Sequence, residues 1–216
     1  MNLFLRAKHW QIFIFTFGLP LLIEIIMIAN MMGNILTAAS NNSTPDFEAL
    51  FSFFKIFPTL ILVSSAALFG WMFSIATGLQ KMLPPEIKMK TTPFKIFFFF
   101  PLVYLLLFCM FIIFTFGSFL HMQAGGAPPI AFFIGFAVIF PLHLFAMFCM
   151  FYTINFVAKT IKTAELQRNV TFSDYIAEFF LVWFHFIGVW ILQPKINKML
   201  ENYENGTPQM PVPNFN

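Results

Sequence analysis

The chain has 216 residues, of which 59% are hydrophobic and 10% are charged, and its formal net charge is +3 at pH 7. Soluble domains have about 25% charged residues, so this composition excludes a soluble globular protein, and apolar residues gathered into long runs are typical of membrane spans. Nearly all basic residues lie in loops on one predicted side of the membrane, which is a topology signal and not a sign of nucleic-acid binding. We therefore predict an all-α, polytopic integral membrane helical bundle that forms a single domain over residues 1–200, with the lipid bilayer as its partner.

The first apolar run predicts a span over about residues 11–36, which is longer than the ~20 residues that cross a bilayer. Arg6 and Lys8 precede this run, and basic residues flank spans on the cytoplasmic side. Because the run is too long for the apolar core of a signal peptide, we expect an uncleaved span and a cytoplasmic N-terminus. Gly18 and Pro20 predict a kink within it.

A polar, slightly acidic loop over residues 36–48 suits the outer side and leads into a second span at about 50–78. Lys55 lies near the outer end of this span, from where its side chain is expected to reach the membrane interface. Further along the span, small residues recur at a spacing of four at Gly70, Ser74 and Gly78. This pattern favours close helix packing.

The stretch Leu79–Lys95 sets the orientation of the whole chain. Its lysines and prolines are Lys81, Lys88, Lys90, Lys95, Pro84, Pro85 and Pro93. A basic, proline-broken connector between two long apolar runs is typical of the cytoplasmic turn of a transmembrane hairpin. Every other segment takes its side of the membrane from this assignment.

Third and fourth spans are predicted at about 96–120 and 130–156. The fourth ends in a basic exit, which agrees with a cytoplasmic connector, and its cations are Lys159, Lys162 and Arg168. The segment Lys159–Asp174 also carries a partial apolar stripe, so we expect a short separate helix on the cytoplasmic membrane surface. Together with Lys81–Lys95, this segment is the expected docking surface for a partner protein.

The last apolar run, at about 175–192, is barely long enough to cross the bilayer. If it crosses, Lys195 and Lys198 lie outside, against the charge rule, whereas both termini stay in the cytoplasm if it re-enters or lies at the interface. We favour four full spans plus this embedded or re-entrant segment, and five full spans are the alternative. Ser173 predicts the N-cap of its helix, and the composition of residues 201–216 predicts a disordered tail.

Both ends of the chain resemble a group of small multi-span membrane proteins common in Bacteroidota. The similar stretches are AKHWQ at Ala7–Gln11, AKTIKTAELQRNVTFSDYIAE at Ala158–Glu178 and IGVWILQPKINKM at Ile187–Met199. In that group a proline commonly precedes the Ile-Gly pair, whereas His185 and Phe186 occupy this region here, which argues against a sharp break. The resemblance implies a membrane protein and carries over no activity.

Glu24 is the most unusual residue of the first span, because it lies between Ile23 and Ile25 in the middle of an apolar run. An ionisable group at that depth costs about 3 kcal/mol, so such residues usually face the protein interior or a water-filled cavity. A proton, ion or substrate site is the functional interpretation, and a protonated or hydrogen-bonded packing residue is the structural one, which we favour. His143 is the expected partner if the first and fourth spans touch, and otherwise it is a neutral core histidine.

Glu178 and His185 lie seven residues apart, so on one helix they would share a face. A proton relay or a metal site would use such a pair, but a metal site needs a third ligand, which the sequence does not supply at helical spacing. We favour the simpler interpretation, in which the pair marks the side of this segment that is turned toward water or toward the bundle.

Cys109 and Cys149 both fall inside apolar runs, where small buried hydrophobes are expected rather than a disulfide or a metal pair. The chain has no phosphate-binding glycine loop, no serine-hydrolase elbow and no zinc-protease motif. We therefore predict no catalytic residue, no cofactor and no metal site.

These features together predict a non-enzymatic, multi-pass protein of the bacterial inner membrane. It is expected to act as a membrane subunit or accessory of a larger assembly, with transport as the favoured theme. A pore-forming or membrane-disrupting effector is the alternative, and a lipid-modifying enzyme that uses Glu178 and His185 ranks below both. The sequence is also compatible with a homo-oligomer.

Overall fold

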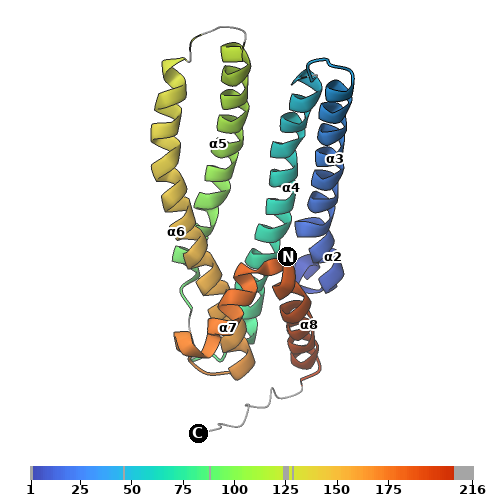
Figure 1. The fold of residues 1–216 in the computed structure, drawn as a ribbon. Coiled ribbons are helices and arrows are strands. Elements are labelled where there is room, and N and C mark those ends of the chain that lie inside the picture. The colour runs from blue at the N-terminus through green and yellow to red at the C-terminus, as the bar shows by residue number, and fades with distance from the viewer. Residues whose placement is uncertain (1, 46, 88, 124–126, 128, 207–216) are drawn as a thin grey trace.

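The computed structural model describes residues 2–45, 47–87, 89–123, 127 and 129–206, and its regular elements are all helices (Figure 1). Four helical stretches in it are long and apolar enough to cross a membrane: His9–Ser40, Ile56–Met82, Thr91–Phe119 and Phe132–Leu166. The predicted all-α bundle of a multi-pass membrane protein is therefore confirmed.

The first span consists of three consecutive helical pieces: α2 (His9–Phe13), the π-helical turn η1 (Ile14–Gly18) and α3 (Leu19–Ser40). The predicted irregularity takes the form of this wider turn. It ends at Gly18, and Pro20 follows in the first turn of α3, where the N–H that proline lacks is tolerated most easily.

The second span belongs to α4 (Phe47–Gly78), which continues into the short 3₁₀ turn η2 (Leu79–Met82). Its small residues face α1 (Asn2–Leu5) rather than another span. A Cβ atom added at Gly70 would lie 2.7 Å from Cε2 of Phe4, and one added at Gly78 would overlap Cδ1 of Leu5. The predicted close packing exists, and its partner is the N-terminal helix. The side chain of Lys55 lies outside the described residues.

The third and fourth spans are α5 (Thr91–Gln123) and α6 (Ile130–Leu166). These two helices pack on each other, as α3 does on α4, so that the spans form two hairpins (Figure 1). Phenylalanine rings fill the contacts at the lower end, where the Phe94 ring stacks on Phe156 with 4.6 Å between centroids. A connector of residues 83–90 joins η2 to α5.

The separate surface helix predicted over Lys159–Asp174 does not form. Instead α6 runs without a break to Leu166 and ends where Gln167 adopts a left-handed conformation, with a φ of 51°. The apolar stripe explains the difference, because Ile161 and Ala164 are fully buried inside the protein rather than resting on lipid. Packing against the bundle therefore continues the helix beyond its membrane span.

The last apolar run forms a helical hairpin of α7 (Phe172–Trp183) and α8 (His185–Glu204). The chain reverses at Phe184, so α8 returns to the end of the molecule where α7 begins (Figure 1). Gly188 permits this turn, because a Cβ atom there would overlap the carbonyl oxygen of Leu181. The break is sharp although no proline precedes the Ile-Gly pair, so the expectation that no sharp break occurs here is wrong.

Two local predictions at the ends of this hairpin also need correction. The N-cap of α7 is Thr171 rather than Ser173, and Asp174 accepts a hydrogen bond from the Thr171 backbone N–H at 2.7 Å. The predicted disordered tail begins too early, because Glu201–Glu204 belong to α8. Residues 207–216 lie outside the described residues.

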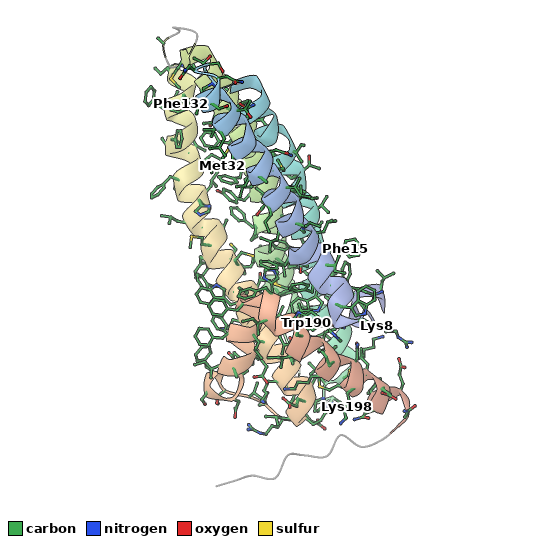
Figure 2. The ribbon with its side chains drawn as sticks, turned by 45° about the vertical axis from the view of Figure 1, so that its right-hand side comes forward. Lys8, Phe15, Met32, Phe132, Trp190 and Lys198 are labelled. Atoms are coloured by element: carbon green, nitrogen blue, oxygen red, sulfur yellow. The ribbon has the colours of Figure 1, made fainter. Side chains whose placement is uncertain are left out.

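The hydrophobic core lies at the base of the molecule, which is the end that holds α1, η2, α7 and α8. Its fully buried side chains come from α4, η2, α5, α6 and α8 and include Trp71, Leu79, Phe94, Val157, Ile161, Leu192 and Ile196. Trp190 of α8 contacts the His9 ring at a centroid distance of 4.7 Å, on the same end as Lys8 and Lys198 (Figure 2). Met32 and Phe132 lie toward the opposite end of the spans, which we call the outer part because it lies away from the core (Figure 2).

Candidate functional site

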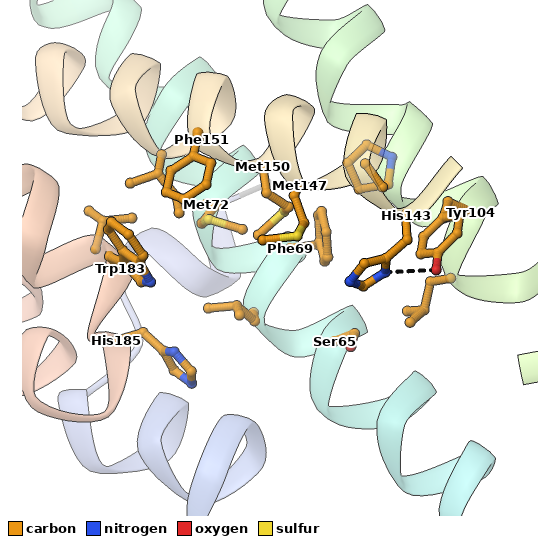
Figure 3. A pocket seen from close by; sticks show the side chains of 16 residues that line it. Ser65, Phe69, Met72, Tyr104, His143, Met147, Met150, Phe151, Trp183 and His185 are labelled. Atoms are coloured by element: carbon orange, nitrogen blue, oxygen red, sulfur yellow. Dashed lines mark hydrogen bonds between the residues drawn. The ribbon is translucent and has the colours of Figure 1, made fainter. Parts of the chain in front are cut away.

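A cavity of about 390 Å³ lies between α4, α5, α6 and the tip of the α7–α8 hairpin (Figure 3). Methionine and aromatic side chains form most of its wall, and the polar side chains in it are Ser65, Tyr104, His143 and His185. It therefore brings together two of the four residues that the sequence marked as candidates. We call it the hairpin cavity.

His143 projects into the hairpin cavity from α6, and its Nδ1 atom lies 2.8 Å from the Tyr104 hydroxyl of α5 (Figure 3). This hydrogen bond replaces the expected contact between His143 and Glu24. Glu24 is only half-buried on α3, and no hydrogen bond or ion pair reaches it from any described residue. The two residues therefore form no pair within this chain.

His185 is the first residue of α8 and lines the other part of the hairpin cavity (Figure 3). Burial lowers the pKa of its imidazole, so the ring is neutral at neutral pH. The predicted shared face with Glu178 does not exist, because the break at Phe184 puts the two residues on different helices. Neither proline nor glycine stands at Phe184, so residue spacing alone could not indicate that the two residues belong to different helices.

Glu178 is instead part of a closed charge cluster that ties α6, α7 and α8 together. Its Oε1 atom accepts hydrogen bonds from Nζ of Lys195 at 3.0 Å and from Nζ of Lys162 at 3.2 Å. Glu165 completes the ring, since its Oε2 atom lies 2.7 Å from Nζ of Lys195 and 3.0 Å from Nζ of Lys162. Two lysines and two glutamates make the charge cluster neutral.

The electrostatics of the charge cluster favour an ionised glutamate. The side chain of Glu178 is 6% exposed, and this burial by itself raises its pKa. The hydrogen bond and charge of Lys195, with a smaller contribution from the charge of Lys162, outweigh burial and bring the pKa below its ordinary value. A carboxylate held in this way stabilises the packing of α7 and α8 on α6, and it is poorly suited to donate a proton.

A second polar cluster, which sequence reasoning missed, centres on the fully buried Gln193 of α8. Its side-chain carbonyl accepts a hydrogen bond from the indole N–H of Trp71 at 2.8 Å. Its amide nitrogen lies within hydrogen-bond distance of three backbone carbonyls, those of Phe4 (3.2 Å), Leu5 (2.9 Å) and Ala7 (3.0 Å). We call these contacts the glutamine clasp.

The glutamine clasp supplies hydrogen-bond donors to backbone carbonyls near the N-terminus. The last carbonyls of a helix have no partner within that helix, and α1 is only four residues long. The clasp supplies donors to these carbonyls, and Asn197 adds one more to the carbonyl of Ala7 at 3.2 Å. Two features of the sequence could have indicated this cluster: a glutamine at the end of an apolar run and a lone tryptophan in the second span.

Among the described residues, no group of three His, Cys, Asp or Glu side chains is arranged to hold a metal ion. Cys109 and Cys149 are both buried and unbridged. The hairpin cavity holds a phenol and two imidazoles in apolar surroundings. Such a set can orient a ligand by hydrogen bonds. A comparison with protein families, curated proteins and solved structures found no match to this chain.

Proposed function

We propose that the protein is a non-enzymatic, multi-pass protein of the inner membrane that serves as a membrane subunit or accessory of a larger assembly. Its partner binds the face formed by residues 81–95 and the end of α6, and the assembly works in transport. The favoured partner is an ATPase, because a membrane subunit without a catalytic site needs an energy source supplied by another chain.

The single observation that supports this proposal is that the two segments predicted to carry the docking surface form one continuous surface. The side-chain amide of Gln167, at the end of α6, donates to the backbone carbonyl of Met82 at 3.0 Å. The hydroxyl of Thr160 contacts Sδ of Met89 at 3.6 Å. One contact at the end of η2 and one in the connector therefore join residues 81–95 to α6, as a preformed docking surface requires.

The positive charge of this surface favours a partner with an acidic surface. Lys81 and Lys95 are exposed, and no carboxylate of the described part of the chain forms an ion pair with either of them. Glu165 and Glu178, by contrast, are both paired with lysines inside the charge cluster. A partner with an acidic surface would be complementary to these lysines, and such complementarity acts mainly through specificity and the rate of association.

The test is purification of the chain from native membranes in a mild detergent, with quantification of co-purifying ATPase subunits. The K81E/K95E variant should lose at least about tenfold of the bound partner, since like charges across an interface cost several kcal/mol. The matched control is K8E/K198E, which changes the same charge on lysines outside the docking surface. Equal loss in both variants, or no stoichiometric partner at all, would contradict the proposal. Depolarisation of cells by the chain alone would support a pore-forming protein instead.

The hairpin cavity favours a second candidate function, which is binding of an apolar small molecule with one polar end. Its volume of about 390 Å³ lies in the range of small-molecule sites, and the pair of Tyr104 and His143 supplies a polar contact in an apolar wall. A lipophilic photoactivatable probe should label Met147 or Trp183 in the wild-type chain. Labelling should fall in A146F, because Ala146 is buried in the cavity wall, and A67F is the control outside it.

A further inference from the structure

A second cavity, of about 620 Å³, lies at the base between the connector, α6 and the start of α7. Unlike the hairpin cavity, it is polar, and its lining includes Lys90 of the connector, Asn155 and Lys159 of α6, and Tyr175 of α7. We call it the interface cavity. It opens beside the proposed docking surface, but Lys81 and Lys95, the lysines assigned to the partner, do not line it.

The interface cavity presents hydrogen-bond donors and positive charge. The Tyr175 hydroxyl donates to Oδ1 of Asn155 at 2.9 Å, which turns the amide nitrogen of Asn155 into a donor without a partner among the described residues. Lys90 and Lys159 likewise form no ion pair within that part of the chain. One carboxylate, Glu86, lines the same cavity, so the two lysines leave it with an excess of positive charge.

Exposed apolar side chains border the interface cavity. The ring of Phe97 contacts the Tyr152 ring of the cavity wall at a centroid distance of 4.6 Å. One helical turn before Tyr152 on α6, Phe148 is 57% exposed, and on α7 Phe172 is 49% exposed. A cationic polar cavity next to an apolar surface has the layout of a site for an amphiphile with an anionic head.

We propose that the interface cavity binds the headgroup of an anionic glycerophospholipid. The phosphate lies between Lys90 and Lys159 with the amide of Asn155 as a further donor, and the acyl chains follow the apolar surface at Phe97 and Phe148. Charge-assisted hydrogen bonds from lysine to phosphate are the strongest that such a cavity can offer. A free phosphate ion would use the same donors but would gain nothing from the apolar border, so the border favours the lipid.

The experiment is native mass spectrometry and thermal unfolding of the detergent-purified chain with phosphatidylglycerol, phosphatidylethanolamine or inorganic phosphate as the probe. Phosphatidylglycerol should remain bound and raise Tm, while phosphatidylethanolamine and inorganic phosphate should do neither at matched concentrations. The K90Q/K159Q variant should bind phosphatidylglycerol at least about tenfold more weakly, because two charged donors are lost. The K81Q/K198Q variant removes the same charge outside the cavity and should change binding less than about twofold.

A third variant keeps the proposal testable if K90Q/K159Q folds poorly. E86Q removes the carboxylate of the interface cavity and keeps its lysines, so it should increase the preference for phosphatidylglycerol over phosphatidylethanolamine. Equal weakening by K90Q/K159Q and K81Q/K198Q would overturn the proposal, because binding would then follow net charge alone. Displacement of the lipid by inorganic phosphate at equal concentration would overturn it as well and assign the cavity to free phosphate.

Discussion

At the base of the molecule the side chains of Trp71, Val157 and Leu192 are completely buried, whereas in the outer part of α6 Phe140 is 66% exposed and Ile134 is 57% exposed. The two regions contain the same kinds of apolar residue, but their surroundings differ. Protein covers the residues of the base, and the hydrocarbon of the bilayer is the expected cover for the outer residues.

Polar side chains of the two regions differ as well, apart from the Tyr104–His143 pair, which joins α5 to α6 within the spans. Ser40 and Ser64, on the spans, donate to carbonyls of their own helices, at Thr37 (2.9 Å) and Leu60 (2.8 Å). Gln193 and Glu178, at the base, make hydrogen bonds to residues of other helices. The comparison teaches that hydropathy is enough to specify the outer helices, while long-range polar contacts specify how the base is assembled.

The largest loss of stability is expected from a substitution that fills the space beside Gly188 at the hairpin turn. Gly188→Ala places a Cβ atom against the backbone carbonyl of Leu181, which has no freedom to move away. We expect destabilisation by at least about 4 kcal/mol, a size that points to a backbone clash. Unfolding in mixed micelles measures it. Gly117→Ala is the control on α5, where a Cβ atom meets nothing within 4 Å, and equal effects of the two changes would contradict the hairpin packing.

The next largest loss of stability is expected when a buried leucine, but not an exposed one, is replaced by alanine. Leu192→Ala removes a fully buried side chain of the base and should cost about 3 kcal/mol of unfolding free energy. Leu144→Ala removes a side chain of α6 that is 53% exposed, and should change stability by less than about 0.5 kcal/mol. The same unfolding assay compares them. A large loss in Leu144→Ala would show that protein, in a homo-oligomer for example, covers the outer helices.

A smaller effect is expected from the charge cluster. Glu178→Gln leaves the Lys162 and Lys195 ammonium groups with one carboxylate between them and should cost about 2 kcal/mol. Glu204→Gln breaks only the exposed ion pair with Arg6 and should cost less than about 1 kcal/mol. A double-mutant cycle between Glu178 and Lys195 should give a coupling above about 0.5 kcal/mol. Additive effects would mean that the cluster does not act as a unit.

The smallest effect is a pH dependence at the start of α7. The hydrogen bond from Arg168, followed by those from the Thr171 backbone and hydroxyl, lowers the pKa of Asp174 from 3.8 to about 2. The unfolded chain therefore binds the proton more tightly, so the stabilisation is fully present above pH 3.8 and is lost as the pH falls through about 2. Hydrogen exchange of residues 172–176, corrected for intrinsic rates, should rise over this window.

Two variants check this titration. Asp174→Asn should exchange faster already at pH 5 and should lose the additional rise at low pH, because it cannot titrate. Glu201→Gln, which removes a carboxylate near the end of α8, should keep the wild-type profile. A rise of the same size in Asp174→Asn would assign the pH dependence to another group.

Patterns along the sequence were sufficient for the features that depend on local composition. Four apolar runs predicted four spans, and the spacing of Gly70, Ser74 and Gly78 predicted a closely packed face. What the pattern could not tell is that this face receives α1. Hydropathy states that a residue avoids water, but it does not state which neighbour covers it.

The candidate site was predicted only in part, for the same reason. His143 and His185 were singled out, and the structure places both in the hairpin cavity. Their expected partners, Glu24 and Glu178, are elsewhere, because each pairing assumed contacts or a continuous helix that the chain does not make. The partners of Glu178 include Lys162 and Lys195, which are 16 and 17 residues away in the chain, a separation at which no spacing rule applies.

The glutamine clasp also constrains the order in which the chain can reach its native state. Gln193 is 186 to 189 residues away from the carbonyls that it holds. All four spans must therefore be synthesised before these contacts can form. Until Gln193 emerges from the ribosome, the indole N–H of Trp71 and the carbonyls near the end of α1 lack this hydrogen-bond partner. The packing of α8 on the N-terminal segment is accordingly a late step of biogenesis. A chain truncated before Gln193 would enter the membrane without the hydrogen bonds that hold this segment.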